Sequence, residues 1–173
     1  MLRKDFVMPI LVLSVFCLVI SGALAFTNSF TAPIVADAAR LRAEVVRGEI
    51  IPDAADFELV EIEGLPESVR EVYRSSNDVG YIFVVVASGY GGDMKIILGL
   101  APDGSVIQSK VLEHSETKGL GSKIEDDSFA GQFDGLDIGR FGAVDAISGA
   151  TISSNAYAKA VCDALEAFGV LFG

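Results

Sequence analysis

The 173-residue sequence is poor in the residues from which several common kinds of site are built. It has no tryptophan, one histidine and two cysteines, and the cysteines do not form a C-x-x-C pair. A site with several histidine ligands, a zinc site and a disulfide framework are therefore not expected. Basic residues are also scarce, since 13 Lys and Arg stand against 24 Asp and Glu and the formal net charge is -11. Nucleic acid is not an expected partner, because phosphate binding requires clustered positive charge.

A long apolar run lies near the N-terminus. Residues 6–26 read FVMPILVLSVFCLVISGALAF and contain no charged residue. A helix of this length can cross a hydrocarbon core about 30 Å thick. Arg3 and Lys4 precede the run, so the positive-inside rule places residues 1–5 in the cytoplasm. The sequence thus predicts a single-pass anchor in the cytoplasmic (inner) membrane, with the rest of the chain on the periplasmic or extracytoplasmic face.

A cleaved signal peptide is the alternative interpretation of the same run. Ala23-Leu24-Ala25 resembles an A-x-A cleavage site. The run is longer than the usual apolar region of a signal peptide, which is about 7 to 15 residues. The length therefore favours an uncleaved anchor over residues 6–26.

Residues 27–50 are expected to form a helical connector. Pro33 fits the first turn of a helix. The apolar residues that follow it at helical spacing are Ile34, Ala38, Leu41 and Val45. A segment with glycine and proline, 48–56, then leads into the globular part. We place this domain at 51–173.

Three strands joined by short turns are predicted in this domain. Residues 81–87 (YIFVVVA) and 94–101 (MKIILGLA) are rich in β-branched and aromatic residues and flank a glycine-rich turn. The turn signal PDGS then predicts a third strand at 106–114 in the same antiparallel meander. Residues 142–147 are a candidate for a further strand, and 152–168 have the spacing of an amphipathic helix. The predicted fold class is α+β: a transmembrane helix, then a small antiparallel sheet with flanking helices.

Hydroxyl side chains gather just before the predicted closing helix. Residues 145–157 read DAISGATISSNAY. Ser and Thr commonly cap the N-terminus of a helix, and hydroxyls at such an N-terminus can also hold or carry a phosphate. The residues by themselves leave both interpretations open.

Two other segments carry candidate sites. The turn at 88–93 brings backbone within reach of a ligand, but it matches neither common phosphate-binding fingerprint. Residues 113–124 read EHSETKGLGSKI and follow a strand end, where sites are often built. The S-x-x-K pattern at 115–118 lacks the companion elements of serine acyl-transfer enzymes. A solvated loop is the structural alternative for this segment.

Two segments together resemble a known family. VLEHSETKGLGSKI resembles an H-x-E-T-P-G-L-G segment, and DAISGATISS resembles the D-x-x-S-G-A-T flavinylation motif. Both belong to the FMN-binding domain of the G subunit of the Rnf electron-transport complex and of the C subunit of the sodium-pumping NADH:quinone reductase. The anchor, the T-A-P-x-x-A segment at 31–36 and the G-Y-G-G turn at 89–92 complete the family's order. Lys118 departs from it, because the family usually has proline there.

The resemblance implies a covalently attached FMN. In this family a flavin transferase uses FAD to join FMN, through its phosphate, to the threonine that closes S-G-A-T, which here is Thr151. Asp145 of the motif is expected to guide the transferase or its metal. A phosphate at this point would lie at the N-terminus of the predicted helix, whose dipole favours an anion. The other residues expected around the cofactor are Tyr90, Glu116, Thr117, Gly119, Leu120, Ser148, Gly149, Ala150, Ser153 and Ser154.

The function that the resemblance implies is electron relay. A membrane-anchored flavoprotein subunit would pass electrons in an ion-translocating complex that couples ferredoxin and NAD redox chemistry to ion movement. The chain has no nicotinamide or iron-sulfur motif, so it would depend on other membrane and peripheral subunits and would not be an autonomous enzyme. The short chain favours the Rnf type over the alternative, the C subunit of the sodium-pumping reductase. A cofactor-free anchored binding module is the alternative from another class.

Overall fold

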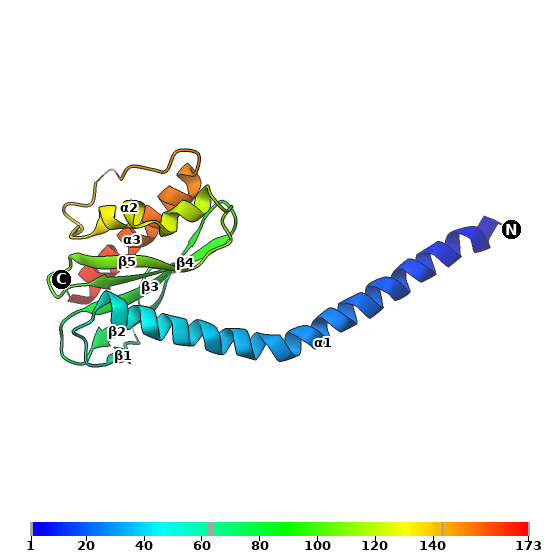
Figure 1. Cartoon of the computed structure of the whole chain (residues 1–173), viewed down its shortest axis with the longest axis horizontal. Helices are drawn as coiled ribbons and strands as arrows, with labels where there is room; N and C mark the ends of the chain where they lie inside the picture. Colours follow the sequence, from blue (N-terminus) through cyan, green and yellow to red (C-terminus); the bar gives the residue numbers. More distant parts are fainter. Residues whose placement is uncertain (1, 62–63, 143, 173) are drawn as a thin grey trace. The chain divides into compact units, whose positions relative to one another are not determined.

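The computed structural model describes residues 2–61, 64–142 and 144–172 (Figure 1). The chain divides into two compact units, one up to Arg42 and one from Ala43 onward. The second unit contains a five-stranded sheet and the helices that pack on it. Its α+β architecture is the predicted fold class.

The first helix, α1, runs without interruption over Leu2–Ile50. It is the one helix among the described residues that is long and apolar enough to cross a membrane, and the mean hydropathy of its most apolar 18-residue stretch is 2.6. Its large apolar side chains between residues 7 and 35 are exposed, as expected of a segment that faces lipid. The helix is therefore consistent with a membrane anchor.

Pro33 lies inside α1 and does not mark the start of a helix. A proline in a helix removes one backbone donor, and helical residues on both sides can still continue the helix. In the turns before Pro33, the hydroxyls of Thr27 and Thr31 donate to the carbonyl oxygens of Ala23 and Thr27, at 2.9 and 3.2 Å. The prediction of a helix start at Pro33 was wrong, because the helix already begins near the N-terminus.

The sheet is a meander in which each strand pairs antiparallel with the next, in the order β1-β2-β3-β4-β5. The strands are β1 Phe57–Leu59, β2 Val69–Ser75, β3 Tyr81–Ser88, β4 Asp93–Leu100 and β5 Val106–Glu113. The last three are the predicted strands, and they are confirmed. The first two were missed, because β1 has only three residues and β2 (VREVYRS) has charged residues interspersed among its apolar ones.

Helices cover both faces of the sheet (Figure 1). Ile82 and Val84 of β3 face the end of α1, where they pack with Ile50. Phe83 and Val85 face the opposite side and pack against α3, Thr151–Phe172. The short elements η1 Gly121–Glu125, α2 Asp127–Ala130 and η2 Gly131–Phe133 complete that layer. The alternation of β3 thus builds two cores, as the period-two geometry of a strand requires.

Residues 142 and 144–147 form a loop, so the strand predicted there was wrong. The backbone of Asp145 bonds to the side chain of Gln132 and not to a neighbouring strand. The closing helix begins at Thr151, one residue before the predicted start, and extends to Phe172. The loop therefore leads directly into the first turn of α3.

Candidate functional site

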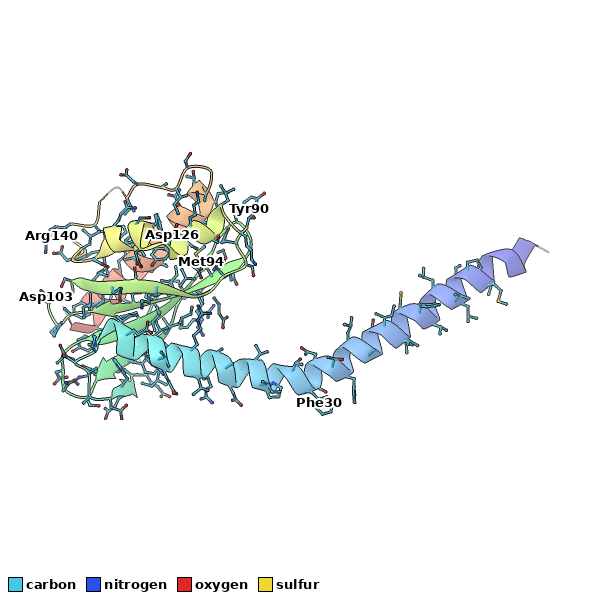
Figure 2. The ribbon with its side chains drawn as sticks, viewed as in Figure 1. Phe30, Tyr90, Met94, Asp103, Asp126 and Arg140 are labelled. Atoms are coloured by element: carbon cyan, nitrogen blue, oxygen red, sulfur yellow. The ribbon has the colours of Figure 1, made fainter. Side chains whose placement is uncertain are left out.

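A cavity of about 430 Å³ lies where three segments meet at one end of the sheet. The β3–β4 turn and the loop after β5 lie at the same end, because β4 pairs with both strands and Lys95 lies opposite Glu113. Figure 2 shows Tyr90 at this end and Asp103 at the opposite one. The start of α3 closes the third side. The lining residues are Tyr90; Glu116, Thr117, Leu120 and Gly121; and Gly149, Ala150, Thr151, Ile152 and Ser153.

The structure brings together most of the residues predicted around the cofactor. Three of them lie outside the cavity lining, namely Gly119, Ser148 and Ser154, and so does Asp145, which was expected to guide the transferase. Two lining residues were missed, Gly121 and Ile152. Gly121 closes the E-T-K-G-L-G segment and Ile152 follows S-G-A-T directly, so their positions in and next to the two motifs are the signal that would have found them.

Glu116 is the buried carboxylate of the cavity, with 7% of its surface exposed. Its Oε2 accepts a hydrogen bond from the Ser153 hydroxyl at 2.8 Å, and its Oε1 accepts one from the Gly91 N–H at 3.2 Å. Its own N–H donates to Nδ1 of His114 at 3.0 Å. A buried carboxylate requires such donors, because burial without them is costly. Glu116 therefore ties the turn, the loop and the helix start into one site.

Close packing around Glu116 and Ser115 explains three glycines of the two loop motifs. A Cβ atom added at Gly89 or at Gly121 would collide with the Glu116 carboxylate, and one added at Gly91 would collide with the backbone carbonyl of Ser115. Only a residue without a side chain leaves room for these approaches. The G-Y-G-G turn and the G-L-G segment therefore fit around one carboxylate.

The start of α3 is shaped by the S-G-A-T motif. Gly149 has a φ of +83°, which an L-residue rarely adopts, and it turns the chain into the helix. The Ala150 N–H then bonds to the Ile147 carbonyl at 2.9 Å. Ser154 supports this turn from within, because its hydroxyl accepts from the Ile147 N–H and donates to the Ala150 carbonyl, both at 3.0 Å. Ser154 is thus a structural residue of the loop.

The four Ser and Thr side chains between 145 and 157 differ in how they are used. Ser153 and Ser154 are buried, and their hydroxyls are engaged in the hydrogen bonds described above. Ser148 is exposed but does not line the cavity, whereas Thr151 is exposed and does line it. Thr151 alone of the four combines access from solvent with a place in the cavity wall.

The helix start and the rim of the cavity offer different surfaces, one polar and one apolar. At the helix start, the N–H groups of Thr151, Ile152 and Ser153 bond to no acceptor in the described part of the chain. Free N–H groups at a helix start favour an anion there, as does the helix dipole. The rim carries large apolar side chains that are well exposed: Tyr90 at 74%, Ile152 at 57% and Leu120 at 42%. An anionic group and a flat apolar group would each find a matching surface.

Comparison with known proteins shows which family this domain resembles. The model of the FMN-binding domain family matches residues 89–166, from the β3–β4 turn into α3. The G subunit of the ion-translocating oxidoreductase complex of Methanosarcina acetivorans is 39% identical over 68% of this chain and 70% of that protein. The G subunit of the Na⁺-translocating ferredoxin:NAD⁺ oxidoreductase complex of Acetobacterium woodii is 30% identical over 91% of this chain and 89% of that protein.

A solved structure shares the fold at lower identity. It is the C subunit of the Na⁺-translocating NADH-quinone reductase from Parabacteroides distasonis, which is 20% identical with a TM-score of 0.51. The match covers 69% of this chain and 78% of that one. The likeness is therefore one of architecture.

Proposed function

The chain belongs to the family of G subunits of ion-translocating oxidoreductase complexes, and on that premise we propose that it is the membrane-anchored flavoprotein subunit of an Rnf-type complex. In this role it relays electrons between other membrane and peripheral subunits. The apolar part of α1 anchors it, and the domain from residue 51 onward holds the cofactor. FMN supplies the redox chemistry when bound, and the chain binds and orients it.

The cavity has the properties that FMN requires. Its volume of about 430 Å³ lies within the range of roughly 300–1,000 Å³ that is typical of cofactor sites. Free N–H groups at the start of α3 suit the phosphate, and the exposed rim of Tyr90, Leu120 and Ile152 suits the apolar ring. Gly149 leaves space beside them for the ribityl chain. The donors and the walls therefore fit both halves of the molecule.

Covalent attachment at Thr151 is the finer part of the proposal. The observation that carries it is the position of Thr151, which is exposed, lines the cavity and is the first residue of α3. A phosphodiester on its Oγ1 would face the unpaired N–H groups of the first turn, which favours the charge by about 0.3 to 1 kcal/mol or more. Ser153 and Glu116 would hold the wall around it. A tethered cofactor would also be retained on an extracytoplasmic face, where a lost flavin is not easily replaced.

Flavinylation of the intact chain tests this proposal. The full chain is coexpressed with a flavin transferase, denatured and examined for in-gel flavin fluorescence and for the mass increment of an FMN-phosphoryl group. We expect the wild-type chain and Ser148→Ala to carry the label and Thr151→Ala to lose it. Thr151→Ser keeps a hydroxyl at the same point and serves as the matched control. An unlabelled wild-type chain with an active transferase would refute the covalent attachment at Thr151.

The type of complex is tested by its partners. The alternative, a C subunit of a sodium-pumping NADH:quinone reductase, is supported here only by a shared fold at 20% identity. Affinity purification of the chain from its native membrane, followed by identification of the co-purified subunits, distinguishes the two complexes. Recovery of Rnf-type subunits supports the proposal, and recovery of the quinone reductase subunits contradicts it.

The orientation in the membrane is part of the same proposal. Arg3 and Lys4 support an N-terminus in the cytoplasm and a domain on the periplasmic or extracytoplasmic face. A reporter enzyme that is active only outside the cytoplasm, fused to the C-terminus, should be active. The mass of the N-terminal peptide in the membrane fraction then distinguishes an uncleaved anchor from a cleaved signal peptide.

A further inference from the structure

The side chain of Gln132 holds the backbone of Asp145 with two hydrogen bonds. The Asp145 N–H donates to Oε1 of Gln132 at 3.0 Å, and Nε2 of Gln132 donates to the Asp145 carbonyl at 3.3 Å. One carboxamide thus satisfies both polar groups of one peptide residue, as a neighbouring strand would do in a sheet. The Asp145 side chain stays exposed to solvent.

Gln132 itself is held in place by the core. It lies in η2, Gly131–Phe133, and the next residue, Phe133, is fully buried. The Phe133 ring packs 5.2 Å from the ring of Tyr157, measured between centroids. Tyr157 belongs to α3, the helix that begins at Thr151. The residue that holds Asp145 is therefore fixed to the same helix that presents Thr151.

The other end of the loop is held from inside α3. The Ser154 hydroxyl binds the Ile147 N–H and the Ala150 carbonyl, as described above. Between these two points of support, Ser148 and Gly149 are exposed. The loop from Asp145 to Thr151 is thus supported at both ends.

We propose that Gln132 is a positioning residue for the attachment of FMN: it holds the loop in the shape in which a flavin transferase recognises Asp145 and reaches Thr151. The inference rests on the flavinylation of Thr151 proposed above. In that reaction the Thr151 hydroxyl oxygen bonds to the phosphorus of the FMN half of FAD. The P–O–P bond breaks, AMP leaves, and the hydroxyl proton passes to a base of the transferase or to solvent.

The expected effect is on recognition and not on the chemical step. Without Gln132, the loop populates the recognised shape for only part of the time, so the apparent KM for the chain rises by the same factor. Two neutral hydrogen bonds at a partly exposed site correspond to a rise of about five- to tenfold. The kcat should change by less than about twofold, because Thr151 and its surroundings are unaltered once the loop is bound.

Steady-state flavinylation of the full chain in detergent tests the proposal, with FAD and a purified transferase. Gln132→Ala should raise KM as stated. Gln132→Glu keeps the acceptor for the Asp145 N–H and loses the donor to its carbonyl, so its KM should lie between those of Gln132→Ala and the wild type. Gln108→Ala removes the same chemical group from a half-buried position on β5 and should behave as the wild type.

Hydrogen exchange of the unlabelled chain separates positioning from folding. The Asp145 amide should exchange faster in Gln132→Ala and stay protected in Gln132→Glu, while the amides in the middle of α3 keep their wild-type protection in both. Two results would overturn the inference. One is a KM for Gln132→Ala equal to that of the wild type. The other is a lower flavinylation rate accompanied by loss of amide protection throughout α3 in both variants. If the wild-type chain is labelled and Gln132→Ala shows the same KM as the wild type, only this inference fails. An unlabelled wild type refutes the covalent attachment at Thr151 as well.

Discussion

The hydroxyl of Ser153 donates a hydrogen bond of 2.8 Å to Oε2 of Glu116, across 37 residues of sequence. Both side chains are buried, and both line the cavity. Ser153 stands two residues after the threonine of S-G-A-T, and Glu116 opens the E-T-K-G-L-G segment. The two motifs that identify the family are therefore parts of one hydrogen-bonded site.

Loss of the Ser153 hydroxyl should destabilise the domain. Ser153→Ala removes a donor from a buried carboxylate, which we expect to lower the free energy of unfolding by about 1–3 kcal/mol. Urea denaturation of the full chain in detergent measures it. In a double-mutant cycle with Glu116→Ala, which removes the acceptor, the two changes should be non-additive by about 0.5 kcal/mol or more. Ser148→Ala, an exposed hydroxyl, should stay within about 0.5 kcal/mol of the wild type. Strict additivity would mean that the bond contributes nothing.

A methyl group at Gly121 should disrupt the same site by crowding. In Gly121→Ala the new Cβ would lie 2.9 Å from the Glu116 Cβ and closer still to its carboxylate. We expect a loss of about 1–3 kcal/mol in unfolding free energy, as for other overpacked sites. The control is Gly131→Ala, whose new Cβ meets its nearest neighbour, Asp134 Oδ2, at 3.8 Å. This change should be neutral or stabilising by up to about 1 kcal/mol. Equal effects of the two substitutions would contradict the packing argument.

The buried pair of Tyr157 and Ser109 gives a third prediction. The Tyr157 hydroxyl donates to Ser109 Oγ at 2.8 Å, and both residues are buried. Tyr157→Phe should cost about 1–3 kcal/mol, because Ser109 is left without its partner. Tyr157→Phe combined with Ser109→Ala should cost less than the sum of the two single changes. Burial raises the pKa of Tyr157, so both effects should be independent of pH between about 5 and 9. Thermal melts across this range measure them.

Asp134 should make stability depend on pH. Burial and then the nearby Asp127 carboxylate raise the pKa of Asp134. A raised pKa in the folded state means that stability is greatest at low pH and falls as the pH rises through that value. Asp134→Asn should therefore be more stable than the wild type at pH 7, by less than about 1 kcal/mol because the side chain is partly exposed. The difference should shrink as the pH falls below about 4.

Asp103 is the matched control for the sign of this effect. Hydrogen bonds from the Ser105 hydroxyl and N–H lower the pKa of Asp103. A lowered pKa contributes stability above the ordinary value and loses it as the pH falls. Asp103→Asn should thus reduce stability at pH 7, the opposite of Asp134→Asn. Urea denaturation at several pH values tests both, and the same sign for the two variants would contradict the assignment.

Strands β3, β4 and β5 and the helix α3 could be predicted because their own residues carry the signal. Apolar and β-branched runs between turn residues read as strands, and Tyr157, Val161 and Leu165 repeat at helical spacing. The short β1 and the charged β2 carry no such signal, since β2 is held by its pairing with β3 and β1 by its pairing with β2. The neighbouring strands thus determine that these two segments form strands, which their own residue pattern does not predict.

The sequence predicted most residues of the site but not the hydrogen bonds that hold them. The motifs indicated Thr151, Glu116 and their neighbours, because residue types and order carry the family resemblance. They did not indicate Gln132, which belongs to no motif and acts through an amide that reaches Asp145 only when η2 packs on α3. Nor did they distinguish Ser154, whose hydroxyl supports the loop, from a residue that faces the cavity.

The sequence by itself determined the apolar anchor run, the last three strands of the antiparallel meander and the hydroxyl-rich helix start, because hydrophobic pattern and turn chemistry act over a few residues. The tertiary structure alone decided that Glu116 is buried, that Ser153 and Ser154 are engaged and that Thr151 is left accessible. These outcomes depend on which backbone and side-chain groups meet across the fold. Hydrogen-bond partners so far apart in sequence are chosen by packing, and only the packed chain settles which hydroxyl remains accessible in the cavity wall.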